Sequence, residues 1–285
     1  MELNYYPGCS ATSTGQEYDR SVRAVFKVLG VELHELDDWN CCGASSAHST
    51  NRALAAALPA RNLAIAQRSG LDMLAPCAAC YSRHKAADHI LRHDPQKRGR
   101  IEEQVGFSYT GQVHVRPPVD VVLTDIGLDK VRARVTKPLK GLKVVSYYGC
   151  LLVRPPEIAE FDDPEHPVMM DQLLLALGAD VKSWSYATDC CGGGLNLTKS
   201  SVAVRLVGRL TDFAREAGAE ALVTACPLCQ VSLEMRQAGN GPKMPVVYFT
   251  ELMGLAFGLE GTDGWWGKHL IDPRPWLFGI LDIGC

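Results

Sequence analysis

Short apolar runs alternate with longer amphipathic segments along the whole chain. Apolar residues recur at helical spacing from Gln16 to Leu29, and Gly30 follows as a stop. Val31 to Leu36 then alternates between apolar and polar residues, as a strand does. Strands that alternate with helices favour a parallel sheet covered by helices. The pattern therefore predicts an α/β protein.

The same succession of elements is found in both halves of the chain. The expected strands cover residues 3–6, 31–36, 72–75, 113–123, 143–147, 180–186, 221–224 and 245–249, with two prolines interrupting the fourth. The expected helices cover residues 16–29, 51–69, 77–92, 125–135, 167–177, 197–217 and 251–257, and one more begins at Pro227. Residues 94–112 are polar, and we expect a surface connection there.

These elements divide into two βα-repeat domains of similar length. Lys137 to Gly141 is the expected hinge, which separates residues 1–138 from residues 139–285. Domains of this size are common, and an apolar content of 47% is sufficient for a buried core. The expected fold class is two pseudo-symmetric, Rossmann-like domains, each with a parallel sheet.

The cysteines form one pattern that is written twice. Each half has a lone cysteine, an adjacent pair that precedes glycine, and a C-x-x-C. In both halves, 34 residues separate the adjacent pair from the C-x-x-C. The first set is Cys9, Cys41, Cys42, Cys77 and Cys80, and the second is Cys150, Cys190, Cys191, Cys226 and Cys229. We infer a duplication with one thiolate-rich site in each half.

Each cysteine group follows the carboxyl end of an expected strand. This edge is where open α/β sheets bind their ligands, so three loops that are distant in sequence should converge on one crevice per half. The glycines after each adjacent pair allow backbone N–H groups to approach sulfur. The two sulfurs of each C-x-x-C share one face if that segment is helical.

Composition and charge narrow the function and the compartment. A net charge of −3 gives no reason to expect nucleic acid or an anionic membrane as partner. The sequence has no apolar run of about 18 residues, and its first residues have neither the basic start nor the apolar run of a signal peptide. We therefore expect a cytoplasmic protein, in which repeated cysteines indicate metal binding rather than disulfides.

Five cysteines per half limit the kind of metal. Zinc takes four ligands in structural sites, and the C-x2-C-x2-C-x3-C-P run of common cubane clusters is missing from the sequence. Sites made only of thiolates select zinc, copper(I) or iron–sulfur clusters. Five thiolates from three loops suit a cluster of several irons better than a single ion.

Four segments resemble the duplicated cysteine-rich CCG domain found in the B subunit of heterodisulfide reductase. They are Tyr-Tyr-Pro-Gly-Cys at 5–9, Tyr-Tyr-Gly-Cys-Leu-Leu-Val-Arg-Pro-Pro at 147–156, Asp-Cys-Cys-Gly-Gly-Gly at 189–194 and Cys-Pro-Leu-Cys at 226–229. The resemblance covers nearly the whole chain. It implies that each set of five cysteines binds a noncubane [4Fe-4S] cluster, and that the two clusters face each other and cleave or form a disulfide between them.

The resemblance also implies partner proteins. The chain lacks ferredoxin-like cubane motifs, so electrons should come from a two-cubane iron–sulfur subunit, like the C subunit of that enzyme, and from a flavoprotein, like its A subunit. The substrate would be a disulfide and its thiols or, as in the variant of sulfur-oxidising bacteria, lipoate-bound sulfur. Two alternatives stay open. One is an electron-transfer subunit of a hydroxy-acid dehydrogenase or quinone reductase complex, and the other is a zinc-stabilised scaffold.

Other candidate residues lie outside the cysteine pattern. Arg154 and Lys199 are near the second set and are candidates for attracting an anionic thiol or disulfide. Residues 155–167 either shape the substrate channel or form an ordinary acidic surface loop. The tail from Thr262 is expected to pack on this chain or on a partner, and Cys285 is expected to be a bystander. Five histidines are expected on the surface or on helix faces rather than as ligands, namely His34, His48, His84, His89 and His93.

Overall fold

Two four-stranded parallel sheets form the framework of the protein. The computed structural model describes residues 1–44, 47–238 and 241–281. In the first sheet the strand order is β2-β1-β3-β4, and in the second it is β6-β5-β7-β8. The first sheet contains β1 (Glu2–Tyr5), β2 (Glu32–Glu35), β3 (Met73–Leu74) and β4 (Val115–Arg116), and the second contains β5 (Lys143–Tyr147), β6 (Asp180–Val181), β7 (Ala221–Thr224) and β8 (Val246–Tyr248). The repeated strand order confirms the predicted α/β fold and the duplication.

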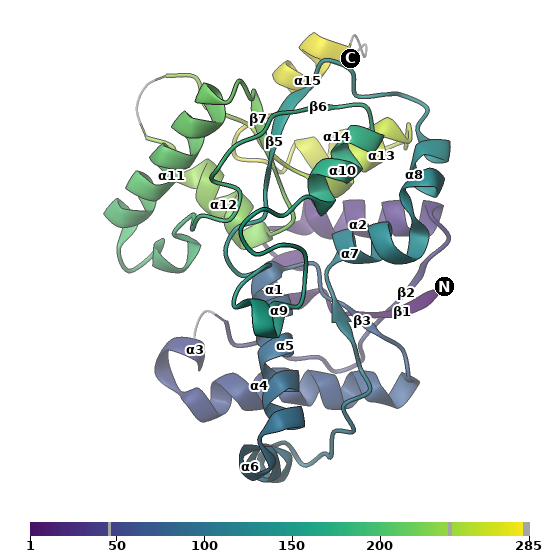
Figure 1. Cartoon of the computed structure of the whole chain (residues 1–285), viewed down its shortest axis with the longest axis vertical. Helices are drawn as coiled ribbons and strands as arrows, with labels where there is room; N and C mark the ends of the chain where they lie inside the picture. The colour runs from purple at the N-terminus through teal and green to yellow at the C-terminus, as the bar shows by residue number, and fades with distance from the viewer. Residues whose placement is uncertain (45–46, 239–240, 282–285) are drawn as a thin grey trace.

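Helices connect successive strands in both halves (Figure 1). The first half contains α1 (Gly8–Ala11), α2 (Gln16–Val28), α3 (Ala47–Thr50), α4 (Arg52–Ala66), α5 (Ala78–His93), α6 (Pro95–Val105), α7 (Pro118–Val121) and α8 (Leu128–Arg134). The second half contains α9 (Pro156–Ala159), α10 (Met169–Ala176), α11 (Ser200–Glu216), α12 (Pro227–Met235), α13 (Phe249–Ala256), α14 (Asp263–Trp266) and α15 (Arg274–Leu281). Short turns of 3-10 or π-helix cover Gln67–Ser69, Val122–Ile126 and Gly193–Leu195.

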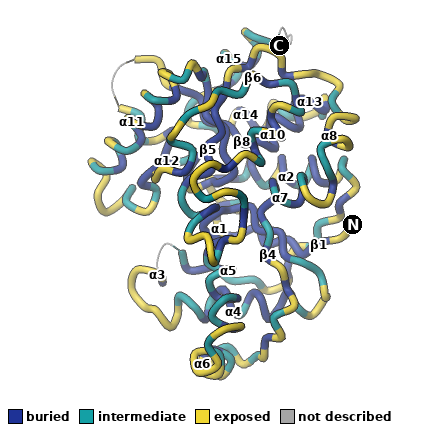
Figure 2. The backbone as a smooth tube through the Cα atoms, viewed as in Figure 1, coloured by how far each residue is buried: buried dark blue, intermediate teal, exposed yellow. Residues whose placement is uncertain are grey.

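The central strands consist almost entirely of buried residues. All four residues of β7 are buried, and β5 is buried from its second residue onward. These two strands pair in parallel, with Val144 opposite Ala221 and Tyr147 opposite Thr224. Strands covered on both faces need such continuous apolar runs, which explains why these segments were predictable from sequence. Figure 2 shows the buried strands at the centre and α6 exposed at one end.

Helices of each half pack against helices of the other half. Helix α2 of the first half packs against α13 and α14 of the second, and α10 of the second packs against α7 and α8 of the first (Figure 1). At the first of these contacts, Tyr18 stacks on Tyr248 with ring centroids 4.2 Å apart. Nearby, the hydroxyls of Ser21 and Thr250 hydrogen-bond at 2.7 Å. Because of these contacts, one hydrophobic core extends through both halves.

The connection between the halves is held by hydrogen bonds. The N–H groups of Thr136 and Lys137 both donate to the carbonyl of Ala256, each at 2.9 Å. The N–H of Leu139 donates to Leu177, also at 2.9 Å, and its side chain is fully buried. The boundary at 138/139 falls inside this segment and stays a prediction.

The expected connection at residues 94–112 does lie largely at the surface, but most of it is helix α6, which was not predicted from the sequence. The Asp94 side chain accepts a hydrogen bond from the N–H of Lys97, and Pro95 occupies the first helical turn. Gly106 ends the helix in the left-handed conformation, with φ of 71°. These start and stop signals are present in the sequence, but the polar composition between them obscured the helix.

Two expected strands are much shorter than the sequence suggested. Within residues 113–123, only Val115 and Arg116 pair with β3, and Pro118 begins helix α7 instead. Proline lacks the N–H that a sheet requires, so the two prolines end the strand. Within residues 180–186, only Asp180 and Val181 pair with β5.

A buried ionic group joins α12 to α13. His269 lies between Glu234 and Glu251, with nitrogen–oxygen distances of 3.0 Å on both sides and all three side chains fully buried. Burial disfavours a charge on the imidazole, but Glu251 and Glu234 outweigh burial and raise the pKa of His269 to about 10. The protonated imidazole therefore binds the C-x-x-C helix of the second half to its neighbour.

We predict that His269 makes the stability of the protein depend on alkaline pH. An imidazole whose pKa is raised on folding stabilises fully below its unfolded value of about 6.5. This contribution is lost as the pH rises towards the pKa of about 10 that His269 has in the folded protein. Removal of one member of a buried pair costs on the order of 3–5 kcal/mol. Chemical denaturation from pH 6.5 to 10 should show the free energy of unfolding falling more steeply in the unaltered chain than in His269→Gln.

The cysteine thiols titrate in both proteins, so the difference between the two curves isolates His269. Parallel curves over this pH range would contradict the prediction.

Candidate metal centre

The ten cysteines of the repeated pattern all lie beyond the carboxyl ends of strands. In the first half, β1 leads to Cys9 in α1, β2 leads to the adjacent pair, and β3 leads to Cys77. In the second half, β5, β6 and β7 lead to the corresponding cysteines. The expected convergence of three loops at one sheet edge per half is therefore present in the structure.

Both sets contain the same mixture of exposed and buried cysteines, although the lone cysteine is the exposed member of the first set and the first cysteine of the adjacent pair is the exposed member of the second. Each set has one exposed member, Cys9 or Cys190, and one partly buried member, Cys41 or Cys150. The remaining three in each set are buried, namely Cys42, Cys77 and Cys80, and Cys191, Cys226 and Cys229. Each site therefore has a closed inner part and one edge that opens to solvent.

Thiols within each half lie in contact without forming disulfides. The sulfurs of Cys42 and Cys80 are 3.3 Å apart, and both residues are free cysteines. Hydrogen bonds from Cys41 and Cys80 lower the pKa of the Cys42 thiol to about 2. In the second half, a hydrogen bond from Cys150 lowers the pKa of Cys190 to about 6. The pKa values of the donor thiols Cys41 and Cys150 are raised in turn, so each hydrogen-bonded pair favours one thiolate, the form that binds metals.

The two thiol sets meet across the boundary between the halves. The largest influence on the pKa of Cys77 is a hydrogen bond with Cys226, which raises it. The pKa of Cys226 is lowered, chiefly by Cys229 and next by Cys77, with a further contribution from the N–H of Ala78. The Tyr18 hydroxyl also crosses the boundary, donating to the carbonyl of Ala225 at 3.2 Å. The two sites are therefore neighbours.

Backbone groups direct positive charge at the sulfurs. The N–H of Gly43 points at the sulfur of Cys41 at 3.4 Å, and the N–H of Gly192 points at Cys190 at 3.3 Å. These contacts confirm the expected role of the glycines after each adjacent pair. Cys77 and Cys226 are the N-caps of α5 and α12, so the positive helix end faces each C-x-x-C.

Two glycines leave room for the inner sulfurs. Gly8 has φ of +69°, and a Cβ there would lie 3.1 Å from the sulfur of Cys80. Gly149 is its counterpart, with φ of +67° and a Cβ position 3.0 Å from the sulfur of Cys229. Left-handed φ angles favour glycine, and a side chain at either position would push the neighbouring sulfur aside.

Two tyrosines near the cysteines were not identified as site residues from the sequence. The Tyr6 hydroxyl donates to the carbonyl of Asn40 at 2.9 Å, and the Tyr147 hydroxyl donates to Asp189 at 2.6 Å. Each bond ties the loop before an adjacent cysteine pair to the segment that carries the lone cysteine. The signal in the sequence is a tyrosine three residues before Cys9 and before Cys150.

The other candidates from the sequence do not contact the cysteine sulfurs through any interaction among the described residues. Arg154 pairs with Glu165 at 2.8 Å and donates to the Thr188 hydroxyl, while Lys199 is exposed at the start of α11. The loop of residues 155–167 contains α9, which packs on α5 of the first half, where the Tyr81 hydroxyl donates to Ala159. The described part of the tail packs on this chain, with Trp266 fully buried. Cys285 lies outside the described residues.

The five histidines that were expected on the surface or on helix faces lie in different environments. His48 is exposed and lies 2.7 Å from an Arg83 nitrogen, and His34 is exposed beside Glu2. The rings of His89 and His93 lie next to each other along α5, with centroids 4.4 Å apart and planes tilted by 32°. His84 is fully buried on the inner face of that helix, a difference that the sequence did not reveal.

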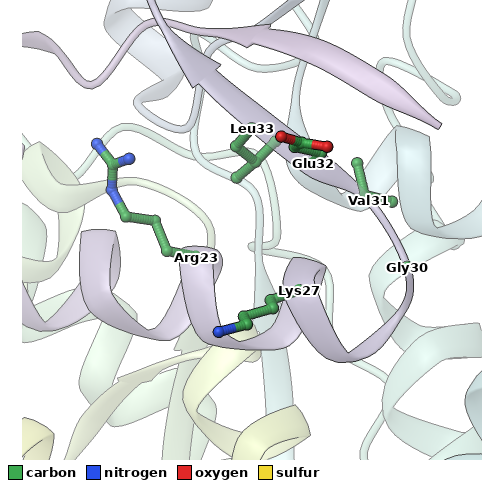
Figure 3. Close-up of a pocket in the computed structure, with 6 residues that line it drawn as sticks. All are labelled: Arg23, Lys27, Gly30, Val31, Glu32 and Leu33. Atoms are coloured by element: carbon green, nitrogen blue, oxygen red, sulfur yellow. The ribbon is translucent and has the colours of Figure 1, made fainter.

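A surface hollow of about 510 Å³ lies away from the cysteines (Figure 3). It is formed at the turn from α2 to β2 and is lined by Arg23, Lys27 and Glu32 among others. This turn precedes β2, so the hollow is at the amino end of the strand. The cysteine loops lie at the opposite, carboxyl end.

The donor set suits a soft metal centre. Each half offers five thiols, three of them buried, together with N–H groups aimed at sulfur. Thiolate ligands without imidazole or carboxylate are typical of zinc, copper(I) and iron–sulfur clusters. The residues that could hold such a group are the five cysteines of each set.

This chain belongs to the CCG family. The sequence model of that family, described as a cysteine-rich domain, matches residues 3–83 and 144–234. The two matches cover more than half of the chain and confirm the resemblance inferred from the motifs. They coincide with the two halves that carry the five-cysteine sets.

Relatives match over almost the full length. The chain is 30% identical to an 8-methylmenaquinol:fumarate reductase membrane anchor subunit from Wolinella succinogenes, over 95% of this chain and 97% of the relative. It is 28% identical to the B subunit of a ferredoxin/F420H2-dependent CoB-CoM heterodisulfide reductase from Methanosarcina acetivorans, over 100% of this chain and 98% of the relative.

A solved structure shares the fold. A hypothetical protein from Helicobacter pylori superposes with a TM-score of 0.73 at 11% identity, over 95% of this chain and 52% of that chain. In the part of the chain that the structure describes, none of the helices is long and apolar enough to cross a membrane.

We predict that Gly8→Ala empties the first site and leaves the second intact. The new methyl group would displace the Cys80 sulfur, whereas Gly70→Ala places a methyl at the same kind of φ, +72°, with no atom within 4 Å. The control should therefore cost only about 1–2 kcal/mol of backbone strain. Metal analysis should show that Gly8→Ala loses about half of the bound metal and that Gly70→Ala retains all of it, the two five-thiol sites being independent.

Gly149→Ala should remove the other half of the metal. Full metal content in Gly8→Ala would show that the site tolerates a side chain beside Cys80.

Proposed function

We propose that this chain is the disulfide-handling iron–sulfur subunit of a heterodisulfide-reductase-type complex. In this proposal, each set of five cysteines holds one noncubane [4Fe-4S] cluster. The observation that carries the proposal is that the two thiol sets adjoin where the halves meet: the Tyr18 hydroxyl of the first half donates to the carbonyl of Ala225, the residue before Cys226, and Cys77 and Cys226 each act on the pKa of the other. Reductive cleavage of a disulfide needs two electrons and two protons and yields two thiols. Two neighbouring one-electron centres match that requirement.

The local chemistry supports a cluster rather than a single ion in each half. A structural zinc site is complete with four ligands, and five cysteines converge in each half. The clusters, when bound, would supply one electron each and a binding point for a substrate sulfur. The chain's own residues would bind the irons, close the inner side of each site and leave the edge at Cys9 and Cys190 open to substrate.

The relatives support the same function at the level of the complex. Besides the Methanosarcina protein, an Archaeoglobus profundus protein described as similar to the B subunit of heterodisulfide reductase is 27% identical over 91% of this chain. We propose that electrons reach the clusters in the cytoplasm from a flavoprotein, by way of a two-cubane iron–sulfur subunit. The substrate would be a mixed disulfide or lipoate-bound sulfur.

A second candidate function is electron transfer in a quinol-linked reductase. It is favoured by the 30% identity to one of the subunits of 8-methylmenaquinol:fumarate reductase over 97% of that protein. In that case the same two clusters would pass electrons onward and would not bind a disulfide. The cysteine sites would be the same, and only the partner and the electron acceptor would differ.

We predict about eight irons and about eight sulfides per chain, and no zinc, in protein purified without oxygen. Cys42→Ala should lose about half of the iron, because Cys42 lies in the buried part of the first set, 3.3 Å from Cys80. Cys191→Ala is the matched change in the second set and should lose the other half. Metal analysis and electron paramagnetic resonance (EPR) would measure both.

Stoichiometric zinc with little iron would support the scaffold alternative and contradict the proposal. Loss of all iron from either single variant would contradict two independent sites.

We predict that the chain loaded with iron, when reduced by a viologen dye, cleaves a mixed disulfide of two different thiols. Both thiols should appear in a 1:1 ratio, and both Cys42→Ala and Cys191→Ala should lose the activity because each lacks one electron centre. Thiol release, measured with a thiol-specific dye, is compared with reoxidation by a soluble quinone. Reoxidation by the quinone together with no thiol release would favour the electron-transfer function.

A further inference from the structure

Most features of the two cysteine sites are repeated, but one part is not. The tyrosine bonds from Tyr6 and Tyr147 have the same geometry, and so do the glycine N–H contacts to sulfur. The helices that follow the C-x-x-C pairs differ at one turn. Seven residues after Cys77 the chain has His84, and seven residues after Cys226 it has Leu233.

His84 belongs to a closed hydrogen-bond network behind the first site. Its Nδ1–H donates to the carbonyl of Cys80 at 2.7 Å, and its Nε2 accepts from Asn62 at 3.2 Å. This pairing is consistent with a neutral ring, and burial lowers the pKa of His84. Asn62 in turn bonds both the N–H and the carbonyl of Asn40, the residue before the adjacent cysteines. The network therefore links both inner cysteine segments of the first half.

The second half has an apolar residue in this place. Leu233 is fully buried and offers no hydrogen bond from its side chain. Thr211, the counterpart of Asn62, uses its hydroxyl within its own helix and donates to Gly208 at 3.0 Å. The second site therefore lacks the histidine–asparagine link, and its C-x-x-C helix bonds the adjacent cysteine pair through the Ser232 hydroxyl, which donates to the Cys191 carbonyl.

Two further pairs of matching positions near the cysteines carry different charges in the two halves. Arg83 is partly buried; burial lowers its pKa, and the Cys42 thiolate opposes this by favouring the charged form. Its counterpart is Ser232, whose hydroxyl donates to the carbonyl of Cys191 at 2.9 Å. Conversely, the neutral Asn40, which precedes Cys41 in the first half, corresponds to Asp189, which places a carboxylate next to Cys190 in the chain. At these two pairs of matching positions, the first half has a cation where the second has a neutral serine, and the second half has an anion where the first has a neutral asparagine.

We infer that the two metal sites are not equivalent and that Arg83 and His84 raise the reduction potential of the first site above that of the second. The inference rests on the proposed iron–sulfur function. Reduction adds negative charge to a cluster, so a nearby cation and hydrogen-bond donors around the ligands raise its reduction potential. A nearby anion and apolar surroundings, such as Asp189 and Leu233 provide in the second half, lower it. His84 acts through Cys80, whose carbonyl it bonds, and Arg83 acts through its charge near Cys42, so both are positioning residues. The first electron taken up by the chain is held in the first half.

The test is a potentiometric titration of the full chain loaded with iron, followed by EPR. The unaltered chain should give two midpoint potentials, and Cys42→Ala should lose the signal with the higher one. His84→Leu should lower the higher midpoint, and Leu233→His should raise the lower one. His89→Leu changes a histidine on the same helix away from this network and should leave both midpoints unchanged.

A second pair of variants keeps the test decisive if His84→Leu fails to assemble a cluster. His84→Gln retains an amide that can bond Cys80 and Asn62, so it should retain most of the unaltered potential. Arg83→Ser copies the residue of the second half and should lower the higher midpoint alone. Equal shifts in His84→Gln and His84→Leu would overturn the role of the hydrogen bonds.

Other results would overturn the whole inference. They are two coincident midpoints in the unaltered chain, or loss of the lower-potential signal in Cys42→Ala. Both results can be observed only in a chain that contains iron–sulfur clusters. They therefore differ from a failure of the proposed function. That failure would appear earlier, as a chain without iron–sulfur clusters.

Discussion

Cys77 and Cys226 lie close enough, where the two repeats join, for each to act on the pKa of the other. Buried thiolates repel one another and lose hydration, so such an arrangement is unfavourable without compensating charge. Backbone N–H groups and the amino ends of α5 and α12 supply part of it. A metal centre would supply the rest. The packing around the thiols holds them in this arrangement.

Packing between the repeats helps to hold the thiols in place. Helix α2 lies against α13 and α14, and α10 lies against α7 and α8. The Tyr18 ring stacks on Tyr248 while its hydroxyl bonds the residue before Cys226. A displacement of one repeat would therefore separate the thiols. The buried His269 group adds to the same rigidity by fixing α12 against α13.

Duplication makes the two sites similar in ligands but does not require them to be similar in electrostatics. Ten cysteines, two tyrosines and two glycine turns repeat between the halves. Arg83 and His84 are replaced by Ser232 and Leu233. For chemistry that handles electrons one at a time, unequal potentials give the first electron a defined location. Equal sites would leave it shared.

The sequence by itself determined the fold class, the duplication and the cysteine sets, because periodicity, strand ends and cysteine spacing are local features. It did not determine α6 or the short strands β4 and β6, since polar composition and two prolines competed with those patterns. The meeting of Cys77 with Cys226, and the burial of His84 rather than His89, came only from the tertiary structure. Both depend on how helices distant in sequence pack together. Residue spacing along the chain does not contain that information.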